Sequence, residues 1–170
     1  MSNRASLKRR YMEKLNREVS TCIRCRLHKS RTHAVPGEGS LETKLMFVGQ
    51  GPGRSEDARG RPFMGRAGRF LDSMLSRIGA ERGEVYITSC VKCFPPNNRR
   101  PRRDELEACR PYLERQLALI NPEIVVLLGD VAFESLLGGG DIRRLHGKLL
   151  VSGGRRYFTD LPSRGWDEVP

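Results

Sequence analysis

The cysteines are the residues whose type and spacing most directly predict chemistry. Two form a CxxC motif, Cys22 and Cys25, and three more follow at Cys90, Cys93 and Cys109. Thiols in a cytosolic chain favour metal or redox chemistry over disulfides. Cys22, Cys25, Cys93 and Cys109 could together hold a zinc ion or a [4Fe–4S] cluster, and their spacing does not separate the two. Cys90 is expected to pack in the core, and the alternative for all five is buried structural cysteine.

A glycine-rich loop after an apolar run is the second candidate site. The run at 45–48 ends in Gly49, Gly51 and Gly53, and an acidic pair and Phe63 follow. The loop is neither a Walker A motif nor a GxGxxG dinucleotide fingerprint. Because glycine permits close backbone approach, the loop suits backbone amides aimed at a small planar ligand, on which Phe63 could stack. The alternative is that Phe63 is an ordinary core residue.

The charge of the chain favours a polyanionic partner, most often nucleic acid. Its 170 residues carry 31 Lys and Arg against 20 Asp and Glu, a formal net charge of +11. The proline- and asparagine-rich segment at 94–103 predicts an exposed basic loop, in which we expect phosphate contacts from Arg99, Arg100, Arg102 and Arg103. The alternative is a solvated charge run. No apolar run is long enough to span a bilayer, and the N-terminus lacks the apolar core of a signal peptide, so we expect a cytoplasmic protein without membrane contact.

Strand and helix patterns alternate along the chain. Buried strands are predicted at 44–48, 84–89, 123–129 and 155–161, and helices at 65–78, at 104–120 with Asp104 as its cap, and at 130–137. A basic amphipathic helix within 1–20 precedes them, with Leu7, Tyr11, Leu15 and Val19 at helical spacing. The predicted fold is α/β: a single domain over 1–170 with three α/β/α layers around a central four-stranded, mainly parallel sheet.

Five long motifs stand in the order found in a known family. They read GQGPGRSED, GRPFMGRAG, VYITSCVKC, PPNNR and ACRPYLE. With the CxxC motif, the chain resembles the iron–sulfur (family 4) uracil-DNA glycosylases over nearly all of 22–148. The resemblance implies a uracil-DNA glycosylase-like fold, a [4Fe–4S] cluster, and hydrolytic removal of uracil from DNA after the nucleotide is flipped out of the stack. It also implies a monomer that binds uracil-containing DNA, with a sliding clamp as a candidate partner.

Carried over by position, the resemblance assigns roles to individual residues. The four cysteines named above match the cluster ligands. Gln50 and Glu56 match catalytic positions in the loop that lines the uracil pocket together with Gly51 and Pro52. The stacking aromatic corresponds to Phe63, and the residue that reads the uracil edge corresponds to Ser89.

Three departures from the family pattern lead us to expect weak or absent activity. Gln50 stands where the family usually has Glu, so no carboxylate is available there to orient water. Ser89 stands where Asn is common, and a hydroxyl reaches fewer groups than an amide. The His-Pro-Ala motif, whose His stabilises the departing uracil anion, is missing from the tail at 159–170. Alternatives are a catalytically inactive DNA-binding relative or a glycosylase with altered base specificity.

The tail admits a reading-frame hypothesis. Residues 160–170 can be encoded by codons which, read one base later, give Thr-Tyr-His-Pro-Ala-Ala-Gly-Met-Lys-Tyr. A one-base insertion near the codon for Thr159 would therefore account for the missing motif. The nucleotide sequence tests this hypothesis directly.

Overall fold

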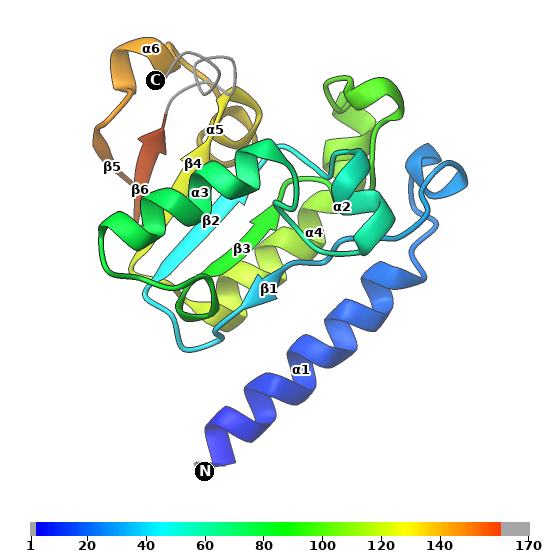
Figure 1. The fold of residues 1–170 in the computed structure, drawn as a ribbon, viewed down its shortest axis with the longest axis horizontal. Coiled ribbons are helices and arrows are strands. Elements are labelled where there is room, and N and C mark those ends of the chain that lie inside the picture. The colour runs from blue at the N-terminus through cyan, green and yellow to red at the C-terminus, as the bar shows by residue number, and fades with distance from the viewer. Residues whose placement is uncertain (1–2, 161–170) are drawn as a thin grey trace.

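A six-stranded sheet forms the centre of the protein, in a computed structural model that describes residues 3–160 (Figure 1). The strand order is β1-β3-β2-β4-β6-β5. The four inner strands run parallel, and each edge strand is antiparallel to its neighbour. The strands are β1 (Glu38–Gly39), β2 (Leu45–Gly49), β3 (Tyr86–Ser89), β4 (Ile124–Leu128), β5 (Leu149–Ser152) and β6 (Arg155–Asp160).

The α/β class is confirmed, but the predicted number of four strands is wrong. The four inner strands are the predicted ones, and the two edge strands were missed. β1 has only two residues, too few to show a periodic pattern. β5 forms a hairpin with β6, and its apolar run at 149–151 has only three residues, shorter than a typical strand signal.

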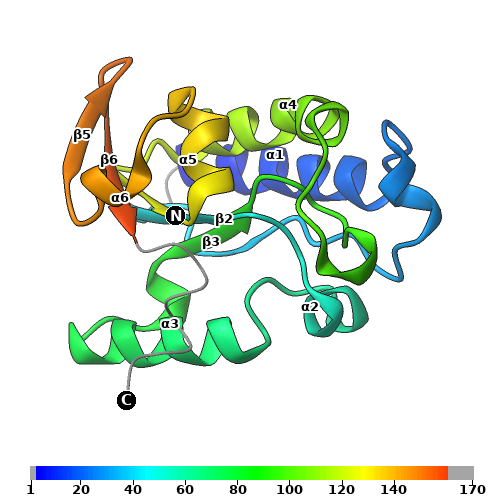
Figure 2. The ribbon, with the colours of Figure 1, turned by 90° about the horizontal axis from the view of Figure 1, so that it is seen from above.

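Helices cover both faces of the sheet, which confirms the three layers. They are α1 (Asn3–Ser20), α2 (Arg54–Arg59), α3 (Arg66–Arg77), α4 (Arg103–Ile120), α5 (Asp130–Leu137) and α6 (Ile142–Leu145). Figure 2 shows α1, α4 and α5 on one face and α2 and α3 on the other. Strand side chains alternate between the layers: Met46 and Val48 belong to the α1/α4/α5 core, whereas Phe47 packs with Leu71 of α3.

The buried stripe of α1 differs from the predicted one. Leu15 and Val19 are buried as expected, but Leu7 and Tyr11 are exposed, and Met12 takes the core position instead. Lys8 lies on the same side as Met12, where its Nζ donates to the Ile120 carbonyl at 3.4 Å. A flexible basic stem covering apolar surface can occupy a position that a hydrophobicity pattern assigns to an apolar residue.

The predicted cap of α4 is also wrong. The helix begins at Arg103, and the Glu105 carboxylate accepts from the Arg102 amide at 2.8 Å, which closes its first turn. Asp104 lies within that turn and accepts from Arg26 at 2.9 Å. Within residues 3–160, no helix combines the length and apolar character needed to cross a bilayer. Residues 161–170, and with them most of the tail to which the reading-frame hypothesis applies, lie outside the described part of the chain.

Candidate active site and metal centre

A cavity of about 440 Å³ opens at the carboxyl ends of the parallel strands β2, β3 and β4. Ligands of open α/β sheets bind at this edge. All six residues that the sequence predicted for the pocket line it: Gln50, Gly51, Pro52, Glu56, Phe63 and Ser89. Residues that were not predicted for the pocket also line it, notably Asn98 and Asp130.

The loop after β2 is held against the loop after β3 by backbone bonds. The Gly49 carbonyl accepts from the Cys90 amide at 2.9 Å, and the Gln50 carbonyl accepts from the Val91 amide at 3.2 Å. A Cβ on Gly51 would lie 2.5 Å from the Val91 side chain, so glycine is required for this close contact. The backbone of Gln50 is therefore fixed, and its side-chain amide offers the pocket both a donor and an acceptor.

The Glu56 carboxylate is fully engaged with backbone amides. It accepts from the Gly53 amide at 2.9 Å, the Met64 amide at 2.7 Å and the Gly65 amide at 2.9 Å. The neighbouring carboxylate, Asp57, is buried and accepts from the backbone amides at 32 and 33. Both oxygens of Glu56 thus join the glycine loop to the segment around the pocket phenylalanine, and the catalytic role expected for Glu56 stays a prediction.

Phe63 occupies a strained backbone conformation beside the glycine loop. Its φ of 52° lies in the left-handed region, which costs a bulky residue about 1–3 kcal/mol. Two glycines make room for it: a Cβ on Gly49 would lie 2.6 Å from the Phe63 ring, and a Cβ on Gly68 would lie 1.7 Å from its carbonyl oxygen. The half-buried ring therefore forms part of the pocket wall, and it also packs against the smaller core cluster. The ring thus has a core contact, and its stacking on a ligand stays a prediction.

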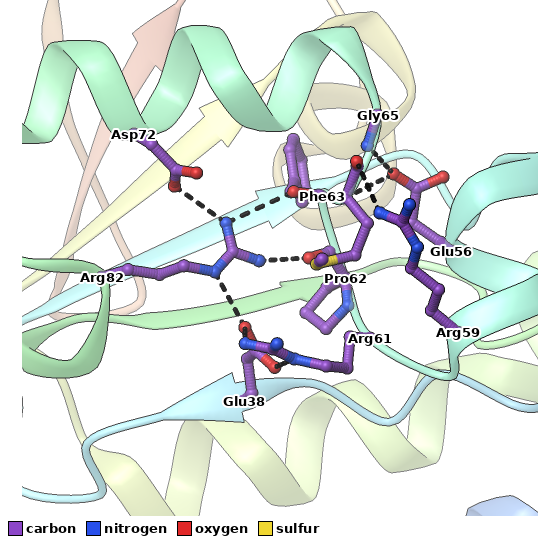
Figure 3. A network of polar contacts seen from close by, with 10 residues as sticks. Glu38, Glu56, Arg59, Arg61, Pro62, Phe63, Gly65, Asp72 and Arg82 are labelled. Atoms are coloured by element: carbon purple, nitrogen blue, oxygen red, sulfur yellow. Dashed lines mark hydrogen bonds and ion pairs between the residues drawn. The ribbon is translucent and has the colours of Figure 1, made fainter.

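An arginine that the sequence reasoning missed holds the backbone of this segment (Figure 3). The Arg82 guanidinium donates to the carbonyls of Pro62 and Phe63, the second at 3.3 Å. Its remaining donors bind Glu38 of β1 at 2.8 Å and Asp72 of α3 at 3.0 Å. Arg82 lies just before β3, so nothing local in the sequence connects it with the pocket.

Ser89 ends β3 above a buried polar network. Ser89 is buried, and its carbonyl accepts from Lys92 Nζ at 2.7 Å. Lys92 Nζ also donates to Thr88 Oγ1 at 2.6 Å and to Gln116 Oε1 at 2.8 Å. Burial lowers the pKa of Lys92 to about 8. Three acceptors satisfy its three donors, so the network fixes the strand end that carries Ser89.

Four of the five cysteines line one small cavity of about 10 Å³ between α1 and α4. They are the predicted ligands: Cys22, Cys25, Cys93 and Cys109. Cys90 belongs to the main hydrophobic core and does not line this cavity, as predicted. His28 and Arg31, which the sequence reasoning did not select as site residues, line the cavity with the thiols.

The donor set of this cavity suits thiolate sulfurs. Arg31 Nη1 donates to Cys93 Sγ at 3.2 Å, and backbone amides donate to Cys109 Sγ at 3.4 Å and Cys22 Sγ at 3.5 Å. Burial raises the pKa of Cys93 and raises that of Cys109 to about 12, so the thiolates need a cation to form. Within residues 3–160, no three His, Cys, Asp or Glu side chains are grouped as a site for a single metal ion.

The four arginines of the basic loop have different surroundings. Arg99 makes a bidentate ion pair with the buried Glu105, at 2.7 and 2.8 Å. Arg100 bridges Asp130 at 2.5 Å and Glu134 of α5 at 2.6 Å. Arg102 and Arg103 are both exposed, and Arg103 pairs with Glu107 at the surface. The first two arginines thus hold the loop in place.

Comparison with known proteins identifies the family. The model of the uracil DNA glycosylase superfamily matches residues 36–164. The chain belongs to this superfamily. It is 44% identical over 143 residues to a type-4 uracil-DNA glycosylase of Archaeoglobus fulgidus, a match that covers 81% of this chain and 72% of the relative. The matched positions include the glycine loop, the phenylalanine segment and three of the strand ends that form the pocket.

Two further type-4 uracil-DNA glycosylases support the same assignment. That of Pyrobaculum aerophilum is 48% identical over 126 residues, which is 74% of this chain and 64% of the relative. That of Sulfurisphaera tokodaii is 53% identical over 119 residues, which is 69% of this chain and 54% of the relative. The chain thus spans less than two thirds of these two proteins. The resemblance inferred from the sequence motifs is confirmed.

Proposed function

We propose that this chain removes uracil from DNA by hydrolysing the N-glycosidic bond, which leaves an abasic site. One observation carries the proposal: this chain belongs to the superfamily, and its Gln50, Phe63 and Ser89 line one cavity at the edge of the sheet. Its volume of about 440 Å³ lies in the range of small-molecule sites. A nucleotide flipped out of the DNA stack would place its base there.

The pocket offers uracil the aromatic face of Phe63 and a few polar groups. The ring of Phe63 would stack on the base, while the Ser89 hydroxyl and the Gln50 amide would bind its edges, with Gly51 and Pro52 closing the wall. The exposed Asn98 amide lies at the rim and provides one more donor and acceptor. These groups match both the carbonyl acceptors and the imide donor of uracil.

Two helix N-termini supply stabilisation for a departing base anion. The first residues of α3, from the N-cap Gly65 to Ala67, line the pocket, as do Gly129 and Asp130 at the start of α5. A helix N-terminus carries about half a positive charge. Charge that develops on uracil as the glycosidic bond breaks is favoured at such a position. Leaving-group stabilisation is therefore the main catalytic term that we assign to the described residues.

Water activation is the weak part of this site. The Gln50 amide can orient a water molecule but cannot take its proton, and the Glu56 carboxylate is occupied by three amides. Asp130 is paired with Arg100. This observation favours, as the second candidate, a slow or inactive relative that binds DNA without releasing the base.

We propose that the four-cysteine cavity holds a [4Fe–4S] cluster. Four thiols and three N–H···S donors support it, and two of the thiols, Cys93 and Cys109, are buried. Four thiolates are the usual ligand set of such a cluster. When bound, the cluster would cross-link the segment after α1 with the loop after β3 and with α4.

The basic loop is proposed as a DNA-backbone contact. Of the four predicted arginines, Arg99 and Arg100 are held in ion pairs with acidic side chains, whereas Arg102 and Arg103 are exposed and are better placed for phosphate. Replacing Arg102 by Gln should weaken binding equally on all sequences and reduce the salt slope by about one. A cytoplasmic location, a monomeric state and a sliding clamp as partner stay predictions.

Base release from defined oligonucleotides tests the proposal. Single- and double-stranded DNA carrying uracil, hypoxanthine or xanthine is incubated with the protein, and abasic sites are scored by alkaline cleavage. We expect release of uracil, reduced about 10- to 100-fold in Phe63→Ala because stacking on an aromatic contributes about 1–3 kcal/mol per base. Release of another base alone would show altered specificity. No release, with retained DNA binding in a gel-shift assay, would leave only the second candidate.

A further inference from the structure

The pocket segment at 62–65 is held by charged side chains. The carbonyls at 62 and 63 accept from Arg82, and the Met64 carbonyl accepts from Arg59 at 3.4 Å. The amides at 64 and 65 donate to Glu56 at 2.7 and 2.9 Å. Figure 3 shows these contacts converging on the segment from both sides. The strained conformation of Phe63 therefore depends on three ionic side chains.

Arg82 is the member of this set that connects the segment to the sheet and to α3. Its guanidinium binds Glu38 of β1, Asp72 of α3 and the two carbonyls at once. Glu38 is held in turn by Arg61 through two bonds of 2.7 and 3.1 Å. The Arg82 side chain is only 19% exposed, so water replaces its bonds poorly. A planar fork with five donors can make this set of contacts, and a lysine ammonium cannot.

Without the Arg82 bonds, the carbonyls at 62 and 63 lose their charged donor, and the contacts from Arg59 and Glu56 reach only residues 64 and 65. A residue in the left-handed region persists only where its surroundings over-determine it. The two carbonyls would turn toward water, φ would return to a negative value, and the ring would leave its contact with Gly49. The pocket would then lose the part of its wall that Phe63 forms, while the rest of the fold remained.

We propose that Arg82 is a positioning residue for base recognition, which holds Phe63 in its left-handed conformation against the glycine loop. The position of the Phe63 ring follows from the structure alone. The effect on uracil release rests in addition on the function proposed above. The two consequences can therefore be measured separately.

Fluorine NMR tests the ring position without any need for activity. The six phenylalanines are replaced by 4-fluorophenylalanine, and the Phe63 signal is assigned by its loss in Phe63→Leu. We expect Arg82→Gln to shift or broaden this signal and to leave the others in place. Arg61→Gln is the matched control, because Arg61 binds the same Glu38 without touching the carbonyls. An unchanged Phe63 signal in folded Arg82→Gln overturns the proposal.

A double-mutant cycle tests the consequence for catalysis. When Phe63 is present, Arg82→Gln should lower kcat/KM for uracil release by about 10-fold or more. When Phe63 is already replaced by Ala, the same Arg82→Gln change should lower kcat/KM by less than about twofold. An equal loss in both backgrounds would mean that Arg82 acts through general stability and would refute the positioning role. If Arg82→Gln does not fold, Arg82→Lys, which keeps the charge and a pair with Glu38, is measured in both assays. If the wild type releases no uracil, the proposed function fails and the NMR result alone decides the role of Arg82.

Discussion

Replacing Glu56 by Gln tests whether the role of the Glu56 carboxylate is structural or catalytic. In the structure one oxygen accepts two amides, from Met64 and Gly65, and the other accepts the Gly53 amide. A glutamine keeps one acceptor oxygen and places an NH₂ group against the third amide. Hydrogen bonds to charged groups contribute about 1.5–3 kcal/mol each, so the loss of one bond and of the charge should cost about 2–4 kcal/mol. For a chain of this size, that lowers Tm by about 5–15 °C.

Thermal unfolding followed by circular dichroism measures this effect, with uracil release measured below the lower Tm. Glu107→Gln is the control, because its surface pair with Arg103 is 62% and 93% exposed and should change Tm by less than about 2 °C. If Glu56→Gln keeps the wild-type Tm and abolishes release, the carboxylate is catalytic and the structural interpretation is refuted.

Three further predictions follow from contacts and burial. Gly68→Ala should destabilise the fold by more than about 3 kcal/mol or block expression, because the added methyl would lie 1.7 Å from the Phe63 carbonyl oxygen. Gly83→Ala is the control: the space around Gly83 is open, so this change should have little effect on Tm. Cys93→Ser should lose iron and visible absorption in the purified protein, and Cys90→Ala should keep both; equal loss in the two variants would contradict the assignment of the ligands. Burial raises the pKa of Glu38, but hydrogen bonds from its two arginine partners outweigh burial and leave the pKa lowered. Glu38 therefore contributes stability above its unfolded pKa of about 4.3, and this stability is lost as the pH falls through the lower, folded pKa. On acidification, Tm should fall less steeply in Glu38→Gln than in the wild type. Parallel profiles of Tm against pH would contradict this linkage.

Most of the inner fold could be predicted because each element carries its own local signal. The strand at 45–49 is a continuous apolar run that ends in glycine, as expected for a parallel strand covered on both faces. The edge strand β5 has an apolar run of only three residues, at 149–151, and its exposed Val151 shows that such a run does not by itself mark a buried strand. The face of α1 was misjudged because Lys8 covers apolar surface with its stem, which a hydrophobicity pattern cannot show.

By itself, the sequence determined the family, the composition of the pocket and the set of four thiols, because these depend on residue types in a fixed order. Only the tertiary structure decided what each charged group does. Glu56 looks catalytic in its motif, yet it binds three backbone amides, and Arg82 has no motif, yet it holds the strained Phe63. The physical reason is that a charged side chain takes its role from the partners it meets in space. Those partners come from segments far apart in the chain, so residue spacing carries no record of them.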